Sequence, residues 1–204
     1  EQKLLETNKK TEFELVHQIG TMAKIYYVKQ DNPKGLGHAI SLGKEFAKNE
    51  PFAILLGDDV VVNKNGKPAL KQLIEVYDQT NSSVLGVQSV DMSVVHKYGV
   101  VKPVNRIDDR TVEICDFVEK PKKEEAPSSL AVLGRYVITP EIFDILDHQA
   151  PGKGGEIQLT DAIKTLLNTQ KVYAYDFEGI RYDVGDKFGF VKATIDFALD
   201  RDEL

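Results

Sequence analysis

The amino-acid sequence predicts an α/β fold, built on a mixed and mainly parallel sheet with helices on both faces. Two observations predict it. Residues 52–56 are an uninterrupted apolar run that ends at a glycine and two aspartates, which is typical of a strand buried on both faces. This run is followed by a helical pattern over residues 69–78 and a second apolar run over residues 83–90, the succession expected of a strand, a crossover helix and a parallel strand.

Asp58 and Asp59 follow the first apolar run directly, after Gly57. In open α/β sheets, ligands bind beyond the carboxyl ends of such strands, so these two carboxylates lie where an active site is usually found. Gly57 permits a sharp turn and the close approach of a ligand. Magnesium uses few protein carboxylates and keeps positions for water and substrate phosphates. The sequence therefore predicts that one or both aspartates hold a metal-bound nucleotide, the alternative being a loop in which they cap the next element.

The composition is that of a globular chain with a sizeable core. It has 204 residues, 42% of them hydrophobic, and a formal net charge of -6. The acidic balance argues against non-specific nucleic-acid binding, and no signal peptide or apolar run of membrane-spanning length is present. A single cysteine, Cys115, excludes an internal disulfide and fits a reducing compartment. We therefore expect a cytoplasmic protein without nucleic-acid or membrane partners.

The first part of the chain contains a helical pattern, a strand pattern and a glycine-containing loop. Residues 1–19 carry apolar side chains at ragged helical spacing, and residues 25–28 are a β-branched and aromatic run typical of a strand. Residues 30–39 form a turn-rich loop that opens into a helix over residues 38–48. Glycine N–H groups at a helix N-terminus can hold an anion or the edge of a base. Because neither usual phosphate-loop spacing occurs, the spacing alone favours a plain loop.

Between about residue 93 and residue 135 the chain changes character. Short strand patterns at residues 98–101 and 114–118 are separated by a polar turn over residues 105–110. We expect a small antiparallel insertion over the carboxyl edge of the sheet, within a single domain that covers residues 1–204. The later elements expected are a strand at 130–138, a helix that starts at 139–141, a loop at 152–155, a helix that ends at 167, a strand at 172–177, a turn at 179–184 and a helix at 188–199.

Several polar residues near strand ends have two interpretations each. Asp58 and Asp183 can bring two carboxylates to one metal, although either one alone is more simply a cap or a solvated residue. Glu119 and Lys120 can hold a sugar hydroxyl and a phosphate, but without context a surface ion pair is the simpler interpretation. The four histidines are scattered without metal-ligand spacing, which argues against a zinc site. The two tyrosines nearest to these positions are most simply core or rim aromatics: Tyr98 and Tyr136.

Seven segments, in this order along the chain, resemble those of one family. They are QDNPKGLGHA (30–39), LLGDD (55–59), YGV (98–100), FVEKP (117–121), APSSLA (126–131) with GRY (134–136), GEIQLTDAI (155–163) and RYDVG (181–185). No single segment is decisive, but the ordered series covers nearly the whole chain. It closely resembles the bacterial UTP-glucose-1-phosphate uridylyltransferases, or UDP-glucose pyrophosphorylases. The resemblance implies the Rossmann-like fold of the nucleotide-diphospho-sugar transferases.

The resemblance also implies a reaction. The phosphate oxygen of glucose 1-phosphate attacks the α-phosphate of UTP, giving UDP-glucose and pyrophosphate, which requires positioning and charge neutralisation and no covalent nucleophile. Asp58 and Asp183 would share a magnesium ion, and with Lys120, which would neutralise the sugar phosphate, they are the expected catalytic residues. Glu119 would bind glucose hydroxyls. Gln30 and Gly35 would bind the uracil edge, and Gly37 and His38 would shape the loop that carries them. The sugar pocket would be lined by Tyr98, Gly99, Gly134 and Tyr136. The remaining substrate-binding positions implied are Asp59 and Glu156.

One part of the family pattern has no counterpart in the sequence. The family opens with a strand and a glycine-rich loop, bearing arginine and lysine, that wraps the UTP phosphates and adds central strands to the sheet. No segment of the 204 residues matches it. The resemblance therefore implies a domain that is incomplete at the N-terminus, clipped at the C-terminus and catalytically weak or inactive by itself. It also implies a homo-oligomer, either a dimer or a tetramer.

Two other functions remain compatible with the sequence. A non-catalytic sugar-nucleotide-binding or regulatory module agrees with the missing loop, and such a module would release no pyrophosphate from UTP in the presence of magnesium. A thymidylyl- or adenylyl-transferase relative is the alternative among the enzymes, and competition between nucleotides would distinguish it.

Overall fold

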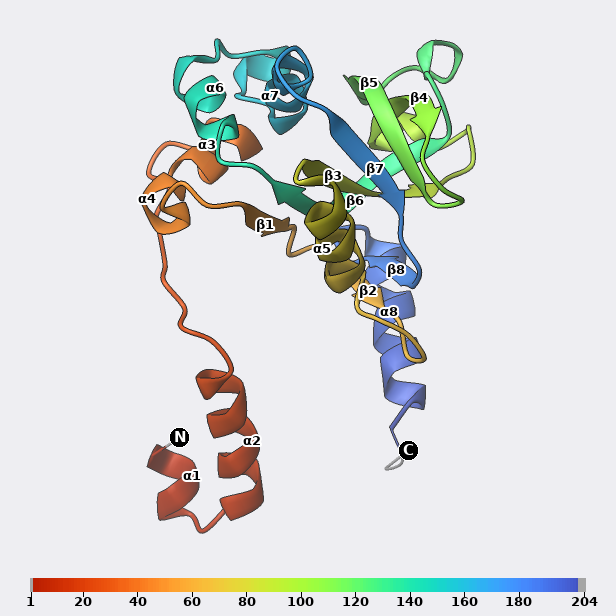
Figure 1. Ribbon diagram of the computed structural model, residues 1–204. Coiled ribbons are helices and arrows are strands. Elements are labelled where there is room, and N and C mark those ends of the chain that lie inside the picture. The colour runs from red at the N-terminus through yellow and green to blue at the C-terminus, as the bar shows by residue number, and fades with distance from the viewer. Residues whose placement is uncertain (1, 202–204) are drawn as a thin grey trace. The chain divides into compact units, whose positions relative to one another are not determined.

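The computed structural model describes residues 2–201, apart from the side chain of Lys153 (Figure 1). The chain divides into two compact units, Glu1–Asp31 and Asn32–Leu204. Glu1, where the first expected helix begins, and residues 202–204 lie outside the described residues. The organisation as one domain over residues 1–204 stays a prediction.

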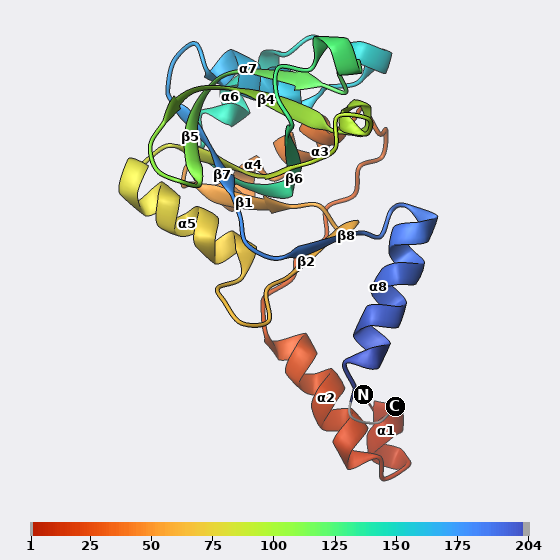
Figure 2. The same ribbon diagram turned by 90° about the vertical axis from the view of Figure 1, so that its right-hand side faces the viewer.

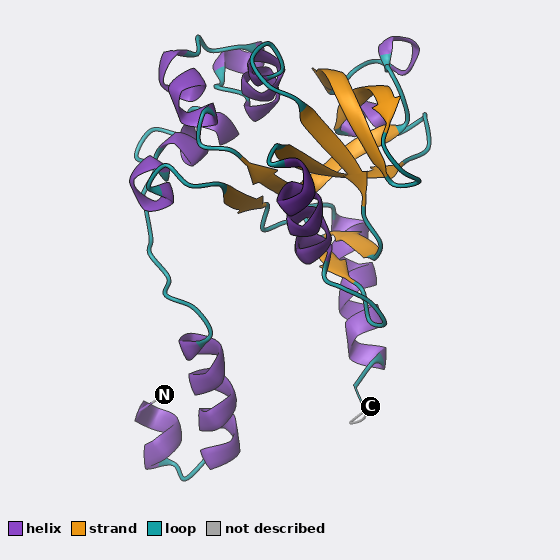
Figure 3. Ribbon diagram, in the orientation of Figure 1, coloured by secondary structure: helices purple, strands orange, loops and turns teal. Residues whose placement is uncertain are grey.

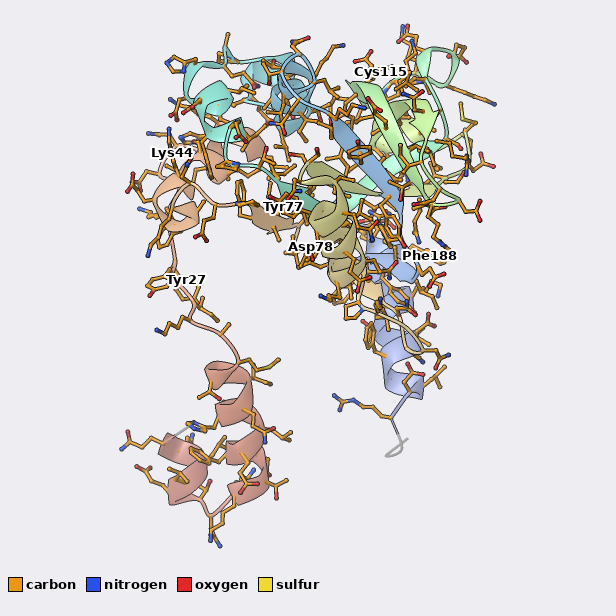
Figure 4. The ribbon with its side chains drawn as sticks, in the orientation of Figure 1. Tyr27, Lys44, Tyr77, Asp78, Cys115 and Phe188 are labelled. Carbon is orange, nitrogen blue, oxygen red and sulfur yellow. The ribbon has the colours of Figure 1, made fainter. Side chains whose placement is uncertain are left out.

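The first unit consists of two helices and an exposed segment. Helices α1 (Gln2–Glu6) and α2 (Lys10–Thr21) contain no buried residue. The strand predicted at residues 25–28 is wrong, because this segment is loop (Figure 3). Tyr27, labelled in Figure 4, is 92% exposed. A strand requires a hydrogen-bonded neighbour, and none of the described strands pairs with this segment.

The second unit is built on a six-stranded mixed sheet with the order β1-β6-β3-β7-β5-β4. The strands are β1 (Phe52–Leu55), β3 (Ser83–Ser89), β4 (Gly99–Arg106), β5 (Thr111–Glu119), β6 (Leu130–Ile138) and β7 (Val172–Asp176). β1, β3, β4 and β7 run in one direction, and β5 and β6 run against them. The predicted α/β fold with a mixed sheet is confirmed. The mainly parallel pairing is corrected, since β6 lies between β1 and β3 and only β3 and β7 are parallel neighbours among the described strands.

Among the described strands, β1 lies at an edge of this sheet, which differs from the predicted strand buried on both faces. The described strand that it pairs with is β6, and Ile54 is buried while Leu55 is 53% exposed. The antiparallel pair expected near residues 98–118 is present as the β4–β5 hairpin. This hairpin is part of the same sheet, because β5 also pairs with β7 and β4 also meets β6.

Helices cover both faces of the sheet (Figure 2). On one face, α5 (Ala69–Thr80) buries Leu73 and Val76, which its helical spacing places on one side, against β3 and β6. On the other face, α6 (Ile142–His148) and α7 (Leu159–Leu166) form the larger core with partly buried residues of α3 (Leu36–Ser41). The remaining helical elements are α4 (Lys44–Ala47), α8 (Lys187–Leu199) and the 3-10 turns Val95–Lys97, Lys123–Glu125 and Lys153–Gly155. None of the helices within residues 2–201 reaches the length and apolarity that crossing a membrane requires.

A second, two-stranded sheet joins two distant parts of the chain. β2 (Asp59–Val62) pairs antiparallel with β8 (Ile180–Asp183), so that Asp59 lies opposite Asp183. Residues 179–184, expected as a turn, therefore include a strand, which follows Gly179 at φ 141°. The backbone N–H of Val184 donates to the carbonyl oxygen of Asp58 at 2.8 Å, which extends the connection to the ends of both strands.

Candidate active site

Asp58 and Asp183 approach each other where β2 and β8 meet. A Cβ atom placed on Gly185 would lie 3.1 Å from Oδ2 of Asp58 and 3.4 Å from Oδ1 of Asp183. The two oxygens therefore face the same small space, which is open because residue 185 has no side chain. Within the described part of the chain, no three metal-ligating side chains cluster together. Two carboxylates that leave positions for water and substrate oxygens match the donor set that magnesium prefers.

Asp59 has a different environment from its neighbour Asp58. Its side chain is 8% exposed and forms an ion pair with Nε of Arg181, while its backbone carbonyl accepts a hydrogen bond from Arg135. Burial raises the pKa of the Asp59 carboxyl, against the lowering effect of the Arg181 guanidinium. Asp58, in contrast, is exposed. The carboxylate of Asp59 thus interacts within the protein, whereas that of Asp58 is accessible to a ligand.

Gly134 allows β6 to pass close to Asp59. It adopts φ 59°, and a Cβ atom there would lie 2.8 Å from Cβ of Asp59 and closer still to its Oδ2. Its carbonyl oxygen accepts a hydrogen bond from the backbone N–H of Leu56 at 3.0 Å. Both the backbone conformation and the close approach require glycine at this position.

A cavity of about 340 Å³ adjoins the two aspartates. Most of the residues predicted for the site line it: Asp58, Asp59, Tyr98, Gly99, Glu119, Lys120, Gly134, Tyr136, Glu156 and Asp183. Gly35, Gly37 and His38 lie in the same unit but do not line this cavity. Gln30 belongs to the first unit. The structure therefore brings together the predicted metal, sugar and phosphate positions.

The glycine-containing loop is held against the segment that carries Glu156. The N–H of Ile157 donates to the carbonyl of Lys34 at 2.7 Å, and the N–H of Gly37 donates to the carbonyl of Ile157 at 2.8 Å. Gly35 adopts φ 95°, and a Cβ atom there would lie 2.8 Å from Cβ of Glu156. The two glycines are thus required by close backbone packing beside the cavity. Their role toward a uracil edge stays a prediction.

Glu119 and Lys120 lie on the cavity wall at the end of β5. Oε2 of Glu119 accepts a 2.6 Å hydrogen bond from the hydroxyl of Thr160, which is buried. Nζ of Lys120 lies 3.7 Å from Oε1 of Glu119, but the lysine side chain is 56% exposed. A pair with this exposure contributes little to stability. The ammonium group therefore remains accessible to an anion in the cavity.

Tyr136 reaches the cavity from β6 and is 6% exposed. Burial, with smaller effects from Glu119 and Asp59, raises the pKa of the Tyr136 hydroxyl. The phenol therefore stays protonated around neutral pH and is able to donate a hydrogen bond to a ligand.

The cavity is also lined by residues for which the sequence predicts no role, among them Lys97, Thr160 and Arg181. Lys97 adds a second ammonium group to the residues that line this cavity. Thr160 and Arg181 bind cavity carboxylates, and both lie within the segments that carry the family resemblance. Their position in those segments is the signal that could have found them, but their partners are visible only in the fold.

The chain matches the nucleotidyl transferase family over residues 2–198. UTP-glucose-1-phosphate uridylyltransferase 2 of Staphylococcus saprophyticus is 55% identical, over 96% of this chain and 67% of that protein. UTP-glucose-1-phosphate uridylyltransferase of Staphylococcus epidermidis is 57% identical, over 90% of this chain and 62% of that protein. The chain thus spans about two thirds of the length of these curated relatives.

Solved structures agree with these matches. A UDP-glucose pyrophosphorylase complexed with UDP-glucose has a TM-score of 0.89 at 40% identity, over 96% of this chain and 74% of that chain. UTP-bound UGPase from Acinetobacter baumannii has a TM-score of 0.86 at 32% identity, over 100% of this chain and 72% of that chain. The chain belongs to the nucleotidyl transferase family, and within it to the group of the UTP-glucose-1-phosphate uridylyltransferases.

Proposed function

We propose that this protein transfers a uridylyl group from UTP to glucose 1-phosphate, with a magnesium ion held by Asp58 and Asp183. The observation that carries the proposal is the approach of the two carboxylates to one space beside Gly185, next to a cavity lined by Glu119 and Lys120. The names of the curated relatives support the choice of substrates.

In the proposed reaction, an oxygen of the sugar phosphate forms a bond to the α-phosphorus of UTP. The bond from that phosphorus to the bridging oxygen breaks, and pyrophosphate leaves with the electron pair. Magnesium bound between Asp58 and Asp183 would supply neutralisation of phosphate charge and orientation of the phosphate oxygens. Lys120 would neutralise the phosphate of the sugar, and Lys97, which lines the same cavity, would add a second positive charge.

The carboxylate of Glu119 would accept hydrogen bonds from glucose hydroxyls. The hydrogen bond from Thr160 to Oε2 restrains the orientation of this carboxylate, and Glu119 lines the cavity together with Tyr98, Gly99 and Tyr136. Gly99 has no room for a side chain, since a Cβ atom there would lie 2.5 Å from Cε2 of Phe117 and 3.3 Å from Oε2 of Glu119.

Titration calorimetry with nucleotide sugars tests the proposal. We expect saturable binding of UDP-glucose in the presence of magnesium, and weaker binding of ADP-glucose and dTDP-glucose. Preferential binding of either competitor would instead support an adenylyl- or thymidylyl-transferase. No binding of UDP-glucose would contradict the proposal. Release of pyrophosphate from UTP, dependent on glucose 1-phosphate and magnesium, would establish a transferase and exclude a binding module.

Thr160→Val is expected to weaken the binding of UDP-glucose about 10-fold, because valine keeps the shape of threonine and removes a hydrogen bond to a carboxylate. Thr160→Ser keeps the hydroxyl and is the matched control, expected to bind within about 3-fold of the wild type. Calorimetric titration of the three proteins measures the difference. Equal affinities of the valine variant and the wild type would contradict the positioning of Glu119 by Thr160.

We also propose that the protein forms a homo-oligomer. Helix α8 exposes several large apolar side chains: Phe188, Phe190, Val191, Ile195 and Leu199. Phe188 is labelled in Figure 4. Exposed apolar surface of this kind marks sites of association and supports a dimer or tetramer.

A further inference from the structure

Arg181 donates hydrogen bonds to three different parts of the site. Its Nε pairs with Oδ1 of Asp59 on β2, its Nη1 donates to the hydroxyl of Tyr98 at 3.1 Å, and its Nη2 donates to Oδ2 of Asp183 at 3.2 Å. The guanidinium carbon lies 5.0 Å from the centroid of the Tyr98 ring. The side chain is 14% exposed. With its charge paired to two carboxylates, Arg181 is poorly placed to bind a phosphate directly.

The bond to Asp183 determines which oxygen of that carboxylate is available. Oδ2 is occupied by Arg181, whereas Oδ1 accepts from the backbone N–H of Asp186 at 3.3 Å and faces the space beside Gly185. This second oxygen is the one near Asp58. Arg181 therefore holds Asp183 in the rotamer that turns Oδ1 toward the proposed metal position.

Asp59 in turn holds Arg181. One oxygen of Asp59 accepts from Arg181, and the other lies against Gly134, so the carboxylate has little freedom to move. Arg135 binds the backbone carbonyl of the same residue. The bond to Tyr98 extends the connection to the sugar end of the cavity, because the carbonyl of Tyr98 accepts from the N–H of Lys120 at 3.0 Å.

We infer that Arg181 is a positioning residue that fixes Asp183 for the divalent ion and Tyr98 for the nucleotide sugar, with Asp59 as its anchor. The inference rests on the proposed function. It assigns Asp59 to the support of Arg181 and leaves Asp58 and Asp183 as the two carboxylates that face the ion. Because a carboxylate held in its binding rotamer loses less freedom when it binds, the removal of Arg181 should lower the affinity for the ion.

Arg181→Lys tests this role, since lysine keeps the charge but cannot make three bonds in a planar fork. Binding of Mn²⁺, as a probe for magnesium, is measured by electron paramagnetic resonance at saturating UDP-glucose, and the affinity for UDP-glucose is measured by calorimetry. We expect the affinity for Mn²⁺ to fall about 10- to 100-fold, as for other residues that orient metal ligands. Arg110→Lys is the matched control, because Arg110 also bridges a carboxylate and a carbonyl, at Glu178 and Asp176, outside the cavity.

The results for the wild type and for Arg181→Lys distinguish a failure of the role inferred for Arg181 from a failure of the proposed function. If the wild type binds Mn²⁺ and UDP-glucose and Arg181→Lys binds Mn²⁺ equally well, the inference is overturned and the proposed function stands. If the wild type binds no Mn²⁺ in the presence of UDP-glucose, the magnesium-dependent function fails and the inference fails with it. Should the lysine variant not fold, Asp59→Asn replaces it. That variant keeps one acceptor for Arg181 and removes the charge, so a smaller loss of Mn²⁺ affinity in the same direction is expected.

Discussion

Asp183→Asn is expected to lower the affinity for Mn²⁺ in the presence of UTP by at least about 100-fold, more than the loss of a residue that only orients a metal ligand. The substitution keeps the size of the side chain but replaces a charged oxygen donor by a neutral amide. Asp58 and Asp183 both lie beside Gly185, so one of these two carboxylates would remain to hold the ion. Electron paramagnetic resonance of free Mn²⁺ measures the effect. Asp58→Asn is expected to cause a loss of similar size.

Asp186→Asn is the matched control for this loss. Asp186 lies three residues further along and caps helix α8, accepting hydrogen bonds from the N–H groups of Phe188 and Gly189. Asparagine is an equally good cap, so the variant removes a nearby negative charge without removing a ligand or destabilising the helix. An equal loss of Mn²⁺ affinity in both variants would mean that net charge, and not coordination by Asp183, holds the ion.

Gly134→Ala is expected to destabilise the protein by about 3 kcal/mol or more, from the left-handed backbone and the overpacking against Asp59 together. A methyl group there has no space, because Asp59 lies against the glycine and is itself held by Arg181 and Arg135. Urea unfolding measures the change in free energy. The affinity for Mn²⁺ should fall as well, since a displaced Asp59 no longer anchors Arg181.

Gly154→Ala separates the cost of the left-handed backbone from the cost of overpacking. Gly154 also has a left-handed backbone, with φ 76°, but nothing lies within 4 Å of an added Cβ atom. It is expected to cost only about 1 kcal/mol, the cost of the backbone conformation alone. An equal loss in the free energy of unfolding for Gly134→Ala and Gly154→Ala would contradict the close contact between residue 134 and Asp59.

The residues around the cavity could be predicted better than the strands that position them. Periodicity gives no information about which loops meet, so the residues alone leave the pairing of Asp58 and Asp183 as one of two interpretations, and the resemblance is what favours it. Their connection is the pairing of β2 with β8, each four residues long. A segment as short as β8, directly after Gly179, does not differ from a turn in its local pattern.

The local sequence of a strand also does not determine its position within the sheet. The apolar run at residues 52–56 predicts burial on both faces, yet among the described strands β1 has one neighbour, β6, which separates it from β3. Residues 25–28 have strand propensity without a partner among the described strands. Thr160 and Arg181 are ordinary polar residues until distances across the fold show the carboxylates that they bind.

Crystallography can show directly whether Asp58 and Asp183 share one divalent ion beside a uridine nucleotide. An anomalous-scattering map from crystals grown with Mn²⁺ and UTP would locate the ion. We expect a single peak about 2.0–2.3 Å from a carboxylate oxygen of each residue, with phosphate oxygens completing the coordination of the ion. A nucleotide-bound ion that contacts neither Asp58 nor Asp183, or that lies at Asp59 instead, would contradict this expectation.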